Sequence, residues 1–329
     1  MDIVWLIIGL LLILGGANWL TDGASAIAKK WGVSDLIIGL TVVAFGTSTP
    51  ELSIGIISAL KGSAPLAIGN VVGSNIFNIF VIIGVVALIH PINIEKSVLN
   101  TQIPMVILSS VALLAIGCGP WLGVPGVSEI IRPEGILLFL FFLIFMRYTF
   151  SQAKSASPED PSAQQASSIA SMNIWKAIGM VILGLAALVV GGDRFVSGAS
   201  GIAASLGMSE ALIGLTIVAA GSSLPELATS ILAAIKGKTG IAVGNVIGSN
   251  IFNIFMVLGI TATISPLPFG GIGVADLLIM TTASILFWIF GRQFGDKIID
   301  RWEGGVLLIC YIGYISAQIF LTVSQSIKS

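Results

Sequence analysis

Two glutamates, Glu51 and Glu226, are the residues best placed for chemistry, because they alone among the acidic residues lie well inside hydrophobic stretches. An ionised carboxylate at membrane depth costs about 3 kcal/mol or more unless it faces a partner or a water-filled cavity. No Lys or Arg lies deep in the same stretches, so a bound cation is the simplest countercharge. The alternative is that both glutamates are protonated and only hold helices together, a state that burial favours.

Oxygen-bearing side chains surround each glutamate at the same spacing. Two hydroxyl residues precede it by three and four positions, on the same helix face, and the next hydrophobic stretch carries a Ser and an Asn four positions apart. These residues are Thr47, Ser48, Ser74 and Asn78 for Glu51, and Ser222, Ser223, Ser249 and Asn253 for Glu226. Carboxylates, amides and hydroxyls are hard ligands that suit Ca²⁺ or Na⁺, and the set has no thiolate or imidazole to favour zinc or copper.

A proline interrupts the helix beside each glutamate. Pro50 has no N–H to donate to the carbonyl of Gly46, and Pro225 stands in the same relation to Gly221. The opened turns leave carbonyl oxygens that can point at an ion, which a membrane tolerates only beside protein or water. We therefore predict that the two hydrophobic segments carrying the glutamates are broken helices.

The composition assigns these residues to a membrane protein. Of the 329 residues, 56% are hydrophobic and only 9% are charged, against about 25% charged residues in ordinary soluble domains. This excludes a soluble enzyme, a disordered chain and a nucleic-acid binder. Ten hydrophobic stretches are long enough to cross a bilayer, at residues 3–20, 34–60, 66–90, 102–118, 133–149, 173–193, 209–235, 241–265, 272–290 and 304–324.

The sequence also repeats itself at an offset of 175 residues, since 28 of the 47 positions in 38–84 are identical in 213–259. A polar linker, 151–172, divides the first repeat (1–150) from the second (173–329). Each half holds five spans, so the second half enters the membrane from the opposite side, as is typical of secondary transporters. We predict an all-α polytopic membrane protein with ten transmembrane helices in two inverted-topology five-helix repeats, with broken helices 2 and 7 around a midplane ion site.

Basic residues set the predicted orientation. Eleven Lys and Arg residues fall on the side of the linker and four on the side of the termini, so we expect a cytoplasmic linker and external termini in the cell membrane. Patterns typical of an intramembrane enzyme, such as a Ser/His pair or HExxH, are missing from the sequence. We expect no cofactor, no nucleic-acid partner, contact with the lipid bilayer, and transport by a monomer, with the oligomeric state left open.

The motifs GTSTPE (46–51) and GNVVGSNIFN (69–78) recur as GSSLPE (221–226) and GNVIGSNIFN (244–253). This arrangement closely resembles the two α-repeats of the sodium/calcium exchangers in the cation/calcium antiporter superfamily. The resemblance implies that spans one and six slide across a core of the remaining spans. It implies the ligands named above as the ion site, with the carbonyl groups of Ala44 and Ala219 serving sodium.

Two positions depart from the family pattern. Ser222 stands where a threonine is common, and Asn253 where some relatives carry an aspartate, which leaves the stoichiometry and any role of K⁺ open. Relatives that exchange Ca²⁺ for H⁺ tend to have glutamate in this motif of the third and eighth spans, where this chain has Gly-Ser-Asn, so the resemblance favours Na⁺ over H⁺ as the coupling ion. Our hypothesis is a secondary antiporter that exchanges Ca²⁺ for Na⁺ at one shared site. A Ca²⁺ or other cation/H⁺ antiporter is the alternative, and a cation channel is a weaker one.

Overall fold

Helices make up nearly all of the computed structural model, which describes residues 1–61, 64–122, 128–155, 172–206, 219–270, 272–293 and 298–328. The first half contains α1 (Asp2–Trp31), α2 (Asp35–Ile38), η1 (Gly39–Val43), α3 (Ala44–Thr47), α4 (Thr49–Leu60), α5 (Ala64–Phe77), η2 (Asn78–Ile83), α6 (Gly84–Ile89), β1 (Ile92–Asn93), η3 (Val98–Gln102), α7 (Ile103–Gly117), η4 (Gly119–Leu122), β2 (Glu129–Ile130) and α8 (Arg132–Ser155). The second half contains α9 (Ile174–Ser205), α11 (Ala219–Gly221), α12 (Leu224–Ile235), α13 (Thr239–Ile251), η7 (Phe252–Leu258), α14 (Gly259–Ile264), β3 (Leu267–Pro268), α15 (Val274–Gln293), β4 (Ile298–Ile299) and α16 (Arg301–Lys328).

Within the described ranges, eight helices are long and apolar enough to cross a membrane, and a bent pair brings the number to nine. That pair, Asp35–Thr47 and Thr49–Leu60, meets at an angle of 43°. The expected span at 209–235 is described only from residue 219 onward, where α12 forms a shorter apolar helix. Its first part falls outside the described residues.

The longest helices, α1 and α9, pack along each other through glycines. A Cβ atom added at Gly16 would lie 2.7 Å from the carbonyl oxygen of Gly184, and one added at Gly184 would lie 2.8 Å from that of Gly16. Such distances leave no room for a side chain, so the two backbones touch. The glycines recur every seven residues and are repeat partners at the 175-residue offset: Gly9, Gly16 and Gly23 in α1, and Gly184, Gly191 and Gly198 in α9.

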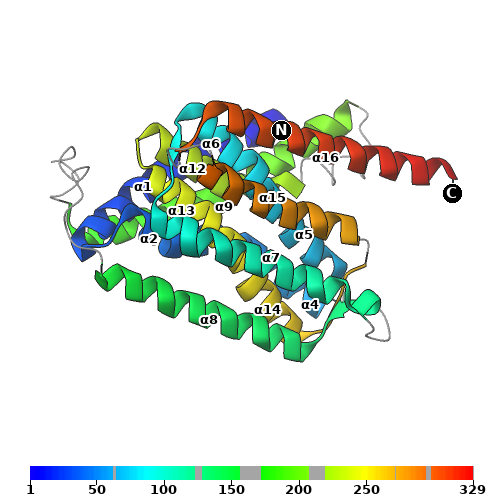
Figure 1. Cartoon of the computed structure of the whole chain (residues 1–329). Helices are drawn as coiled ribbons and strands as arrows, with labels where there is room; N and C mark the ends of the chain where they lie inside the picture. The colour runs from blue at the N-terminus through cyan, green and yellow to red at the C-terminus, as the bar shows by residue number, and fades with distance from the viewer. Residues whose placement is uncertain are drawn as a thin grey trace.

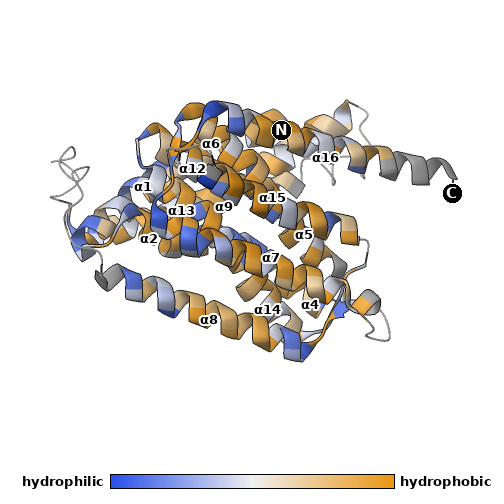
Figure 2. Cartoon of the chain, viewed as in Figure 1, coloured by the Kyte–Doolittle hydropathy of each residue, from blue (hydrophilic) through white to orange (hydrophobic). Residues whose placement is uncertain are grey.

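Two further glycine contacts fix the outer helices. A Cβ at Gly135 of α8 would lie 2.9 Å from the carbonyl oxygen of Gly259 in α14, and one at Gly304 of α16 would lie 2.7 Å from that of Gly84 in α6. Gly84 and Gly259 are repeat partners. The two contacts place α8 and α16 on opposite sides of the bundle (Figure 1). Along α8 the hydrophobic residues occupy the middle and the hydrophilic ones the ends (Figure 2), as a membrane-crossing helix requires.

The helical run Thr239–Ile264, which joins α13, η7 and α14, forms the centre of the bundle, and its apolar window is entirely buried within the protein. Gly244 brings α13 against α2, where an added Cβ would lie 2.5 Å from the carbonyl oxygen of Leu36. Loops are joined by two short antiparallel ladders, β1 with β4 and β2 with β3. These strands of two residues each depart slightly from the all-α expectation.

Candidate cation-binding site

Each candidate glutamate lies in the first turn of a helix that starts after a break. The helix α3 ends at Thr47 and α4 begins at Thr49, with Pro50 in its first turn; α12 begins at Leu224, again with proline in the first turn. Proline is tolerated there because the N–H groups of the first turn have no partner within the helix. The glutamates therefore lie where the helix dipole favours negative charge.

Glu51 and Glu226 are both buried, and the hydrogen bonds that their carboxylates accept from described residues are on the Oε1 atoms. The Oε1 atom of Glu226 accepts from the hydroxyl groups of Ser48 at 3.2 Å and Ser249 at 3.4 Å. The Oε1 atom of Glu51 accepts from Ser74 at 3.4 Å. The Oε2 atom of each glutamate is buried and has no hydrogen-bond partner among the described residues.

The contact of Ser48 corrects one expectation. Its spacing from Glu51 predicts a shared helix face, but its hydroxyl donates to Glu226 in the other repeat. The helix is interrupted at Ser48 itself, whose ψ of 7° differs from the helical value. The i, i+3 relation therefore does not hold across this position. The bonds that Ser74 donates to Glu51 and Ser249 donates to Glu226 each stay within one repeat.

Two asparagines outside the predicted ligand set accept hydrogen bonds from predicted hydroxyl ligands. The hydroxyl of Thr47 donates to Oδ1 of Asn245 at 3.0 Å, and that of Ser222 donates to Oδ1 of Asn70 at 3.0 Å. These two contacts are repeat partners, and both cross between the repeats. A hydroxyl that donates its proton in this way keeps its oxygen lone pairs for another partner, such as a cation.

The repeat symmetry is not complete around these asparagines. The amide nitrogen of Asn245 donates to Ser230 at 3.1 Å, whereas that of Asn70 has no partner among the described residues. The repeat partner of Ser230 is Gly55, which has no hydroxyl to offer. Of the remaining predicted ligands, the hydroxyl of Ser223 donates to Ser74 at 3.0 Å.

The predicted carbonyl ligands lie in the interrupted segments. The carbonyl oxygen of Ala44 already accepts from the backbone N–H of Ser48 at 3.0 Å and from the hydroxyl of Thr47 at 3.4 Å. Its repeat partner, Ala219, begins the short helix α11 directly after residues that the structure leaves undescribed.

Asn78 and Asn253 are the predicted amide ligands. Both side chains are buried, and the Oδ1 atom of each has no hydrogen-bond partner among the described residues. A π-helical segment begins at Asn78, and another begins one position before Asn253. Such segments are frequent at functional sites, but the sequence analysis did not predict them.

Among the predicted ligands, four buried oxygens have no hydrogen-bond partner in the described part of the chain, and they form two repeat-related pairs: Oε2 of Glu51 and Glu226, and Oδ1 of Asn78 and Asn253. Neither glutamate forms an ion pair with any described basic side chain. The described residues also contain no group of three His, Cys, Asp or Glu side chains placed to hold a metal. Acceptor oxygens without donors suit a hard cation.

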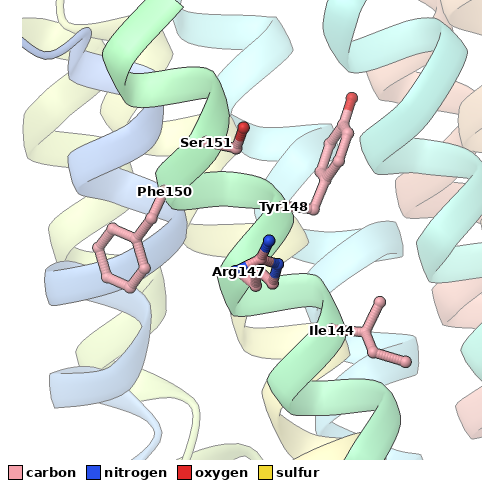
Figure 3. A pocket seen from close by; sticks show the side chains of 5 residues that line it. All are labelled: Ile144, Arg147, Tyr148, Phe150 and Ser151. Carbon is pink, nitrogen blue, oxygen red and sulfur yellow. The ribbon is translucent and has the colours of Figure 1, made fainter.

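A pocket of about 560 Å³ lies elsewhere, on α8, and is lined by Ile144, Arg147, Tyr148, Phe150 and Ser151. Figure 3 shows Ile144 and Tyr148 projecting to one side of the helix and Phe150 to the other. These side chains come from a single helix and do not converge on one point. The pocket is thus a surface feature separate from the buried oxygens.

Comparison with known sequences identifies the family to which the chain belongs. The profile of the family described as "Sodium/calcium exchanger protein" matches residues 1–151 and 176–320. The chain belongs to this sodium/calcium exchanger family. It is therefore a membrane transporter of the cation/Ca²⁺ antiporter kind, and the repeated glutamate motifs lie within the two matched regions.

Individual relatives cover almost the whole exchanger chain. The putative antiporter CaxA of Alkalimonas amylolytica is 39% identical over 94% of this chain and 96% of its own length. The sodium/calcium exchanger MaX1 of Methanosarcina acetivorans is 34% identical over 96% of this chain and 98% of its own. A solved structure of the sodium-calcium exchanger NCX_Mj, soaked with Na⁺ and Ca²⁺, has a TM-score of 0.81 at 31% identity, covering 96% of this chain and 97% of that one.

Proposed function

We propose that the protein exchanges Ca²⁺ for Na⁺ across the membrane by alternating access, and that both ions use the same buried oxygens. The observation that carries this proposal is the set of four acceptor oxygens without partners, on Glu51, Glu226, Asn78 and Asn253. Each repeat contributes one carboxylate and one amide. The relatives named as sodium/calcium exchangers support the same choice of ions.

Charge balance explains how such a site couples two fluxes. Two carboxylates neutralise one Ca²⁺, so the loaded site is uncharged and can be closed off inside the membrane. Na⁺ ions in adjacent subsites reach comparable neutrality. An empty site would carry two unpaired carboxylates. Closing off such a site inside the membrane costs several kcal/mol, because each buried charge costs about 3 kcal/mol. The carrier therefore reorients when loaded and not when empty.

The site's symmetry supports the inverted architecture. We infer ten transmembrane helices in two five-helix repeats, 1–150 and 173–329, with broken helices 2 and 7, a cytoplasmic linker at 151–172 and external termini. In this arrangement α1 and α9 move as one unit, because their glycines bring the two backbones into contact. The ion-binding set is Glu51, Glu226, Thr47, Ser48, Ser222, Ser223, Asn78, Asn253, Ser74 and Ser249, with the carbonyl groups of Ala44 and Ala219 for Na⁺. A single chain contains the whole set.

Exchange of Ca²⁺ or another cation for H⁺ is the second candidate. The same unpartnered Oε2 atoms that suit a cation could each hold a proton, and protonated carboxyls would also be neutral when the site closes. The two candidates differ in which gradient drives Ca²⁺ uptake.

Proteoliposomes containing the purified protein separate the candidates. Vesicles loaded with Na⁺ or with choline are diluted into medium containing labelled Ca²⁺, with the pH equal on both sides and the membrane potential clamped. We expect rapid uptake only in the Na⁺-loaded vesicles, and none in vesicles without protein. Uptake that ignores Na⁺ but follows an imposed pH gradient would replace Na⁺ exchange with H⁺ exchange.

A further inference from the structure

Two asparagines that are not among the predicted ligands link the two repeats beside the site. Oδ1 of Asn75 accepts from the amide nitrogen of Asn253 at 3.0 Å, and Oδ1 of Asn250 accepts from the amide nitrogen of Asn78 at 3.2 Å. The two contacts are repeat partners, and all four side chains are buried. Each bond therefore joins a predicted ligand of one repeat to an asparagine of the other.

These bonds determine which end of each ligand amide faces the site. An asparagine amide presents an acceptor oxygen on one side and a donor NH₂ group on the other. Because the NH₂ groups of Asn78 and Asn253 are held by Asn250 and Asn75, their Oδ1 atoms point elsewhere, and these are the oxygens without partners. A reversed amide would present N–H groups to a cation, which repel it.

Asn75 is itself held in place. Its amide nitrogen donates to the backbone carbonyl of Asn250 at 3.2 Å. Asn250 lies near the end of α13, two positions before the π-helical segment that begins at Phe252. Asn75 is thereby held at both ends of its amide, because its nitrogen donates to Asn250 and its oxygen accepts from Asn253.

We propose that Asn75 and Asn250 are positioning residues that orient the amides of Asn253 and Asn78, so that each presents its oxygen to the transported cation. Because each bond crosses between repeats, the ligands of one half are set by the other half. Asn75 and Asn250 each follow a predicted Ser ligand by one position, which turns them about 100° away from it around the helix. They therefore act on the site through the amides of Asn253 and Asn78. This inference rests on the cation site of the proposed function.

A crossed double-mutant cycle tests the proposal. Ca²⁺ affinity is measured by titration calorimetry on the purified full-length protein, and the KM for Ca²⁺ by vesicle flux. We expect Asn75→Leu to weaken Ca²⁺ binding and raise the KM at least tenfold, with a smaller effect on kcat. In an Asn253→Asp background the same change should cost less than threefold, because a carboxylate has two equivalent acceptor oxygens and no N–H that needs a partner.

The rescue should also be specific to the crossed pair. Asn75→Leu in an Asn78→Asp background should keep its full tenfold cost, since Asn78 is held by Asn250 instead. The mirror cycle pairs Asn250→Leu with Asn78→Asp and predicts the reciprocal pattern. Where Asn75→Leu does not yield monodisperse protein, Asn75→Ala is measured in the same backgrounds.

The outcomes separate this proposal from the proposed function. Equal losses in all backgrounds would show a packing role and overturn the positioning proposal, even with Na⁺-driven Ca²⁺ uptake intact in the wild type. Rescue in the crossed pair alone supports it, whichever ion drives uptake. A wild-type protein that binds no Ca²⁺ would overturn the cation site and this inference together.

Discussion

Replacing Glu226 by Gln should weaken Ca²⁺ binding about 60- to 300-fold. The change is nearly isosteric, and the bonds from Ser48 and Ser249 to Oε1 can persist. It removes one of two carboxylates from a buried site, so the site with Ca²⁺ bound carries one net positive charge. A charge at membrane depth costs about 2.5–3.5 kcal/mol, and about 1.4 kcal/mol corresponds to a tenfold change in affinity.

The assay is calorimetric titration of Ca²⁺ into the purified protein without Na⁺, together with Ca²⁺ flux in vesicles. Glu95→Gln is the matched control, because it removes the same charge from an exposed side chain outside the site. We expect the control to bind Ca²⁺ as the wild type does, and Glu226→Gln to lose exchange. An affinity within threefold of wild type for Glu226→Gln, or equal losses in both variants, would refute the charge argument.

Two further predictions concern the contacts of α1. Gly16→Ala should lower the midpoint of thermal unfolding, because its Cβ would lie 2.7 Å from the carbonyl oxygen of Gly184 and overpacking costs about 1–3 kcal/mol. Gly15→Ala is the control, since a Cβ there meets no described atom within 4 Å. An equal loss of stability in both variants would contradict the packing argument. The ion pair between Asp22 and Lys236, at 2.6 Å with side chains 28% and 26% exposed, should show a coupling of about 0.2–1 kcal/mol in a double-mutant cycle of unfolding that weakens with salt. A larger coupling that salt does not change would contradict its partly exposed setting.

Much of the fold could be predicted from local sequence, because hydrophobic length and the 175-residue repeat are properties of the chain itself. The break before Glu51 follows from Pro50 in the same way, and the structure bends there. The C-terminal end of α1 was not predicted correctly, because the predicted span stops at residue 20 whereas the helix continues to Trp31. Those added turns carry Gly23, which belongs to the contact with α9.

The contacts between repeats could not be predicted, because residue spacing reports neighbours on one helix and not partners across two. Ser48 illustrates this, since it bonds to Glu226 and not to the nearby Glu51. The π-helical segments are similar, because nothing in the residue pattern around Asn78 or Asn253 distinguishes them from an ordinary helix. A contact such as that of Ser48 with Glu226 forms only when the two halves pack against each other.

The central claim, that Ca²⁺ and Na⁺ share one set of buried oxygens, is tested most directly by crystallography with ion exchange. Crystals are soaked in Sr²⁺, a strongly scattering substitute for Ca²⁺, and then in increasing Na⁺ at constant ionic strength. We predict a single Sr²⁺ peak coordinated by Oε2 of Glu51 and Glu226 and by Oδ1 of Asn78 or Asn253, fading as Na⁺ rises. A Sr²⁺ peak away from these oxygens, or one that Na⁺ does not displace, would contradict the account.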